Sequence, residues 1–106
     1  MNEEMINTTY GDFAVAKVEM AAALENAIEQ RASLETKKAL ALQSGEIEGK
    51  NAELRDAAAK TLFAKEYAEL ADAEKEERAT VSKHALAMIE VERVKQLLRL
   101  AELLAK

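Results

Sequence analysis

Residues 44–51, SGEIEGKN, decide the fold, because they hold two of the three glycines and separate two long stretches without Gly or Pro. Gly45 can adopt the left-handed conformation in which many helices end. The side-chain oxygen of Asn51 can cap a following helix. The sequence therefore predicts a turn at 44–51 between two helices.

The stretches on either side of this turn predict helices of unequal length. Upstream, nothing interrupts 12–43, and Thr9 with Asp12 weakly matches a capping box, so we expect a tail at 1–11 and a helix at 12–43. Downstream, we expect one continuous helix at 52–105, roughly 80 Å long. The alternative is a bend within the charged stretch 72–78, which would produce a three-helix bundle.

The composition favours helices throughout. The chain of 106 residues has no Pro, 49% hydrophobic residues, 4% aromatic residues and 33% charged residues. This composition is typical of long helices and coiled coils. We therefore expect an all-α fold, namely a long antiparallel helical hairpin that resembles a coiled coil and forms a single domain over 1–106.

Two helices of unequal length cannot cover each other completely. The shorter predicted helix reaches along the longer one to about Ser82, which leaves the most apolar segment without a partner in the same chain. At 100° per residue, this segment carries an apolar stripe that needs a second molecule. We therefore predict a homo-oligomer, with a dimer as the favoured form. The predicted interface consists of Leu86, Ile89, Arg93, Leu97, Leu100 and Leu104.

Two arginines lie within apolar stripes, Arg93 in the second predicted helix and Arg31 in the first. A buried guanidinium needs a carboxylate. The candidates are Glu90, which lies three residues before Arg93, Glu35, which lies four residues after Arg31, or acids on a facing helix. We interpret these as ion pairs that fix the register of the assembly. The alternative is a pocket for an anionic ligand.

Few side chains are suited to catalysis or metal binding. The chain has no Cys, and His84 is its single histidine. Position 81 is Val81, whereas metal sites of helical bundles use Glu three residues before His. We therefore predict no catalytic, cofactor-binding or metal-binding residue and no enzymatic activity.

Charge and hydropathy restrict the partners and the location. The formal net charge of -5 argues against a surface that binds nucleic acid. No apolar run approaches the roughly 20 residues that span a bilayer, and the first residues lack the order of a signal peptide. We therefore expect a cytoplasmic protein that does not enter membranes.

Short motifs in the second half resemble those of small helical proteins of unknown function encoded in phages and prophages. The motifs are Gly49-Lys50-Asn51 followed by Arg55, Tyr67 with Leu70, and Ile-Glu-Val-Glu-Arg at 89–93 followed by a Leu-rich segment at 97–104. The resemblance implies a phage origin, with either a structural role in an assembly or an accessory role in phage DNA metabolism.

The preferred function at this stage is a structural or protein-interaction module that forms a homo-oligomer of helical hairpins. The alternative is an accessory protein that binds nucleic acid, or a partner of an enzyme of phage DNA metabolism, through basic residues near the C-terminus. An unidentified protein partner is also left open.

Overall fold

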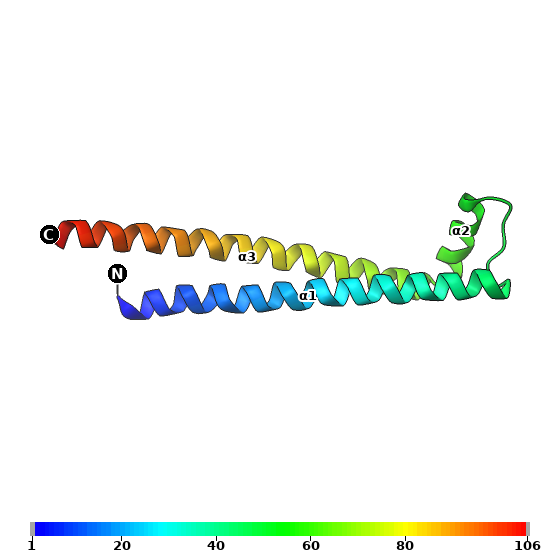
Figure 1. The fold of residues 1–106 in the computed structure, drawn as a ribbon, viewed down its shortest axis with the longest axis horizontal. Coiled ribbons are helices and arrows are strands. Elements are labelled where there is room, and N and C mark those ends of the chain that lie inside the picture. Colours follow the sequence, from blue (N-terminus) through cyan, green and yellow to red (C-terminus); the bar gives the residue numbers. More distant parts are fainter. Residues whose placement is uncertain (1, 106) are drawn as a thin grey trace. The chain divides into compact units, whose positions relative to one another are not determined.

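A computed structural model describes residues 2–105. These residues form three helices: α1 at Glu3–Ser44, α2 at Ala52–Leu62 and α3 at Ala64–Ala105 (Figure 1). No strand occurs in the described part of the chain. The all-helical fold and the long helical hairpin are confirmed.

The N-terminal helix begins earlier than predicted, so the tail at 1–11 is wrong over residues 3–11. The side-chain oxygen of Asn2 accepts a hydrogen bond from the Met5 backbone N–H at 2.8 Å, which caps α1. Glu3 and Glu4 lie at the positive end of the helix dipole. Gly11 does not interrupt α1, because one glycine costs a helix only about 1 kcal/mol.

The predicted turn is confirmed, and Gly45 and Asn51 act in it as expected. Gly45 has φ of 83°, in the left-handed region, and Ile47 donates its backbone N–H to the Ala41 carbonyl at 3.2 Å. The Asn51 side chain accepts a hydrogen bond from the Leu54 backbone N–H at 2.9 Å and so caps α2.

The continuous helix predicted at 52–105 is wrong at Phe63. Phe63 has φ of -107° and ψ of 34°, outside the helical region, and separates α2 from α3. Its side chain packs against the buried cluster of Ala41, Ile47 and Ala59. Burial of this aromatic side chain offsets the break. The alternative bend at 72–78 is also wrong, because α3 passes through that stretch without interruption.

Contacts divide the chain into two units, which we describe separately. The turn unit comprises Ala23–Glu76, and the terminal unit comprises residues 2–22 with 77–105. In the turn unit, Arg31 lies 3.9 Å from Glu74, and Lys37 lies 3.5 Å from Glu66. The residue numbers on α3 fall as those on α1 rise, so the two helices are antiparallel in this unit.

The terminal unit is also an antiparallel pair. The Phe13 and His84 rings are 5.2 Å apart, and Lys83 Nζ donates to Glu19 Oε2 at 2.9 Å. The segment after Ser82 therefore has a partner in the same chain. Our premise that it overhangs a shorter helix is wrong, because α1 is longer than predicted.

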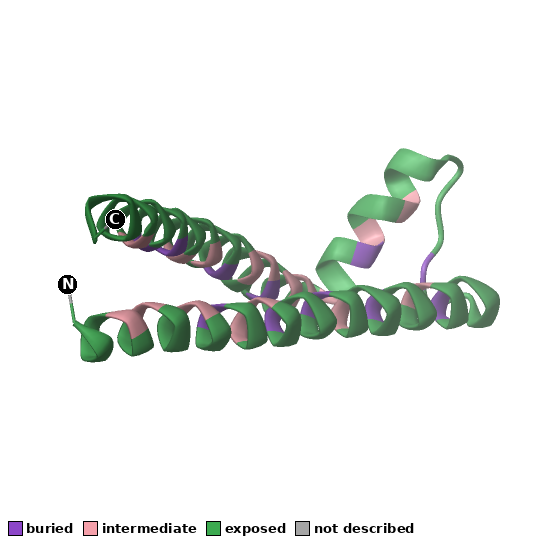
Figure 2. Ribbon diagram, turned by 60° about the vertical axis from the view of Figure 1, so that its left-hand side comes forward, coloured by how far each residue is buried: buried purple, intermediate pink, exposed green. Residues whose placement is uncertain are grey.

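The buried residues of α1 and α3 lie on the sides of the two helices that face each other within each unit, and most of them are small (Figure 2). The spacings of these positions are 7, 4, 7 and 7 residues on α1 and 7, 11 and 3 residues on α3, which are the spacings of a heptad repeat. Small residues let two helices approach closely, but each removes little apolar area from water. The buried positions on α1 and α3 are Ala16, Ala23, Ala27, Leu34, Ala41, Ala73, Thr80, Val91 and Val94.

The glycines provide a matched test of this fold. A Cβ at Gly11 would meet nothing within 4 Å, so Gly11→Ala should raise the free energy of unfolding by up to about 1 kcal/mol. Gly45→Ala should lower it by about 1 to 2 kcal/mol, because φ is positive there. Thermal unfolding followed by circular dichroism checks both. A lower melting temperature for Gly11→Ala would contradict the early start of α1.

Candidate interaction surface

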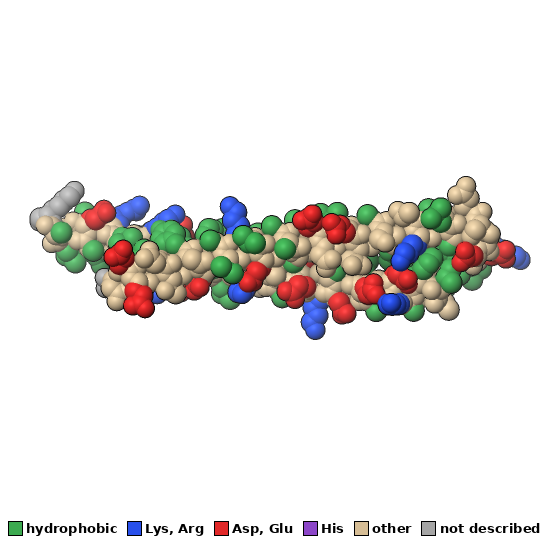
Figure 3. Space-filling view, turned by 90° about the horizontal axis from the view of Figure 1, so that it is seen from below, with side chains coloured by type: hydrophobic (Ala, Val, Ile, Leu, Met, Phe, Trp, Pro, Cys, Tyr) green, Lys and Arg blue, Asp and Glu red, His purple; other side chains and the backbone are tan. Residues whose placement is uncertain are grey.

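The second half of α3 carries large apolar side chains in contact with water. Leu86 is 65% exposed and Leu104 is 78% exposed, and Ile89, Leu97 and Leu100 between them are also exposed. We define the α3 stripe as Leu86, Ile89, Arg93, Leu97, Leu100 and Leu104. The structure therefore places all six predicted interface residues on one exposed stripe. Figure 3 shows other hydrophobic side chains at the surface, interspersed with charged ones.

The α3 stripe faces away from α1. Projected at 100° per residue, its six members fall within a sector of about 80°. Val91 and Val94, which are buried against α1, lie roughly 160° and 100° around the helix from the centre of this sector. The terminal half of α3 is therefore apolar on two sides, of which α1 covers one.

Two grooves in the terminal unit extend the apolar surface from the stripe towards α1. One groove, of about 390 Å³, is lined entirely by apolar residues: Met5, Leu97, Leu98, Leu100, Ala101 and Leu104. The other, of about 480 Å³, has Val15 and Leu86 among charged neighbours that include Asp12, Lys83 and Glu90. The grooves therefore make α1 part of the candidate surface.

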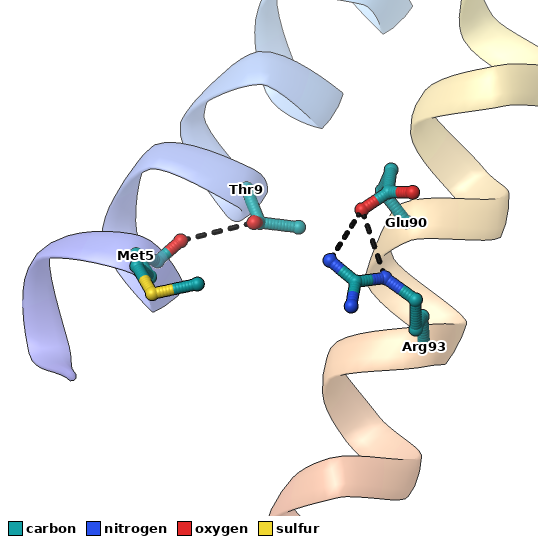
Figure 4. Close-up of polar contacts among 4 residues, drawn as sticks. All are labelled: Met5, Thr9, Glu90 and Arg93. Carbon is teal, nitrogen blue, oxygen red and sulfur yellow. Dashed lines mark hydrogen bonds and ion pairs between the residues drawn. The ribbon is translucent and has the colours of Figure 1, made fainter. Parts of the chain in front are cut away.

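The ion pair predicted for Arg93 is present, but it is not buried. Arg93 Nε and Nη2 donate to Glu90 Oε2 at 3.1 and 3.0 Å (Figure 4). The two side chains are 57% and 53% exposed. Thr9 lies on the part of α1 beside this ion pair (Figure 4). Its hydroxyl donates a hydrogen bond to the Met5 carbonyl at 2.9 Å. Because Arg93 and Glu90 are exposed and pair with each other, neither leaves a buried charge that a second chain would have to neutralise.

Of the candidate partners of Arg31, Glu35 is wrong, and an acid on the facing helix takes its place. Arg31 lies beside Glu74 at 3.9 Å and is about half exposed, whereas Glu35 lies 3.5 Å from Lys38. Sequence spacing could not show Glu74, which lies on the other long helix. Arg31 therefore joins α1 to α3 in the turn unit rather than two turns of α1.

The Tyr67 side chain, assisted by Glu35, raises the pKa of Lys38.

The described residues show neither a candidate metal site nor a buried polar side chain that lacks a partner. They contain no group of three or more His, Asp or Glu that could hold a metal ion, and they leave no buried side-chain nitrogen or oxygen without a hydrogen-bond partner. His84 is half buried and stacks against Phe13 with an angle of 34° between the rings. Its observed role is therefore packing between α1 and α3.

The comparisons with known proteins give no relative. No protein-family profile, curated protein or solved structure matches this chain. No helix in the described part of the chain is both long enough and apolar enough to cross a membrane.

The sequence analysis missed the α1 side of the candidate surface. Met5 lies within the predicted tail, and Val15 and Val18 lie on an exposed face of α1 beside Ala14 and Glu19. The available signal was Asn2 followed by two glutamates, which is a typical helix start. A helix from Glu3 would have placed Met5 opposite the end of α3.

Two adjacent residues test which side of α3 is covered within one chain. Val94 is 2% exposed against α1, so Val94→Ala should lower the free energy of unfolding by about 1 to 3 kcal/mol. Arg93→Ala removes an exposed ion pair and should cost less than about 1 kcal/mol. Denaturant unfolding at high dilution measures both losses. A larger loss for Arg93→Ala would mean that its guanidinium is buried.

Proposed function

We propose that this protein is a structural module that assembles with copies of itself through the α3 stripe. A structural role is one of the two that the resemblance to phage-encoded helical proteins implies. The observation that carries the proposal is an inverted size order: alanines dominate the space between the helices, and leucines, isoleucines and valines lie in water. An interface between chains would bury the larger set.

The sizes of the two sets support this proposal. Of the ten buried hydrophobic residues of the described chain, six are Ala, whereas eighteen larger hydrophobic side chains are exposed. Burial of a Leu or Ile side chain contributes about 1.5 to 3 kcal/mol, and Ala contributes much less. Most of the apolar free energy that this sequence can gain is therefore still available to an association.

The total surface area supports the same proposal. The chain exposes 7827 Å², whereas a folded monomer of 11.7 kDa exposes about 5,900 Å². The excess of roughly 1,900 Å² is larger than the 800 Å² or so that each partner buries in an interface of standard size. The surface is sufficient for one such contact and for a further one.

The charges near the C-terminus favour protein contact over nucleic acid. Lys83 pairs with Glu19 on α1, and Arg93 and Lys95 pair with Glu90 and Glu92 on α3. Binding to nucleic acid depends on cations that neutralise phosphates. Each of these three cations is paired with a carboxylate, so together they do not form the basic surface that nucleic-acid binding requires.

An aspartate in the stripe tests the proposal. We expect Leu100→Asp to weaken self-association at least about a hundredfold, because both copies would bury an unpaired carboxylate. Sedimentation equilibrium measures the association constant, and circular dichroism confirms that the helices remain.

Met88→Asp is the matched control for this experiment. Met88 is an exposed apolar residue of the same helix, 45% accessible, and it lies roughly 140° from the stripe. The Met88→Asp variant should have the same association constant as the unmodified chain. An equal loss of association in both variants, or none in Leu100→Asp, would remove the stripe from the interface.

A further inference from the structure

We propose that the second copy binds in the antiparallel direction, α3 stripe against α3 stripe, about a two-fold axis at the level of position 95. This inference rests on the proposed self-association and adds its direction and register. The face involved belongs entirely to the terminal unit, where the six stripe residues share one side of a continuous helix.

The spacing of the stripe is symmetric about position 95. When a two-fold axis relates two antiparallel helices, a residue before the axis lies opposite the residue that follows it by the same number of positions. Leu86 therefore lies opposite Leu104 of the second copy, and Ile89 lies opposite Leu100 to within one residue. Exposed apolar side chains meet at both ends of the contact.

Arg93 distinguishes the two directions. In a parallel pair with the same stripe, each Arg93 would lie beside Arg93 of the second copy, and like charges at the centre of an apolar contact are costly. In the antiparallel pair, Arg93 lies opposite Leu97 of the second copy. Its aliphatic stem can cover that leucine while the guanidinium keeps its two hydrogen bonds to Glu90.

The edge of the stripe provides complementary charges for the antiparallel pair. Glu92 and Arg99 lie on the same edge, about 20° apart at 100° per residue, and on opposite sides of position 95. In an antiparallel pair, matching edges of the two helices meet, so Glu92 faces Arg99 of the second copy. The two-fold axis repeats this pair, which makes two ion pairs for each dimer.

Both groups are available for this contact. Within one chain, they are seven residues apart, or about 10 Å along the helix axis. Among residues 2–105, Arg99 has no carboxylate within 4.0 Å. Glu92 lies 3.3 Å from Lys95, and both of these side chains are more than half exposed. Exposed pairs of this kind are weak, so Glu92 can exchange Lys95 for Arg99.

Distances between identical labels test the direction. The chain has no Cys, so Ala85→Cys and Gln96→Cys each introduce one spin-label site on the stripe edge without removing a stripe residue. In the proposed dimer, the labels at position 85 lie about 30 Å apart along the helix axis, and those at position 96 about 3 Å. A parallel dimer would give short distances at both positions.

Charge reversal provides a second test that leaves the stripe unchanged. Glu92→Arg alone and Arg99→Glu alone should each weaken the dimer about tenfold, because two attractive pairs become repulsive. The double variant should restore the affinity, since it recreates both pairs with exchanged signs. A double variant as weak as the single variants would overturn the proposed register.

Sedimentation of the labelled chains separates this inference from the proposed function. A dimer with a long distance at position 85 and a short one at position 96 supports both. A dimer with short distances at both positions overturns the antiparallel register and leaves self-association standing. A chain that remains monomeric at the labelling concentration overturns both.

Discussion

The structure depends on close packing between α1 and α3 through small side chains. In the turn unit the facing positions are alanines except for Leu34, and in the terminal unit they are Ala16, Thr80, Val91 and Val94. Two helices can cover each other along one side only, and here that side carries the smaller residues. The larger apolar residues therefore remain exposed within one chain, where the proposed contact between molecules would bury them.

This constraint connects the fold to the proposed function. The exposed stripe of α3 lies on a helix whose other side is held by α1, by the Glu19 ion pair with Lys83 and by the Phe13 contact with His84. A surface on a rigid, already formed helix loses less conformational entropy on binding than a flexible segment does. The pairing within the chain thus prepares the surface for association.

Local sequence signals predicted the parts of the fold that local interactions determine. The turn at Gly45 and Asn51 and the Glu90–Arg93 pair depend on residues within a few positions of each other. The break at Phe63 was missed because it depends on packing against Ile47, and Glu74 could not be named as the partner of Arg31 because it is distant in sequence. The stripe residues are exposed, but the overhang from which the interface was predicted does not exist.

The most direct measurement of the central claim is the molar mass of the unmodified chain by sedimentation equilibrium over micromolar to millimolar concentrations. The account predicts reversible association to twice the chain mass of 11.7 kDa, with the monomer recovered on dilution. A single species of 11.7 kDa over the whole range would contradict it. The exposed leucines of α3 would then remain in water without a partner copy.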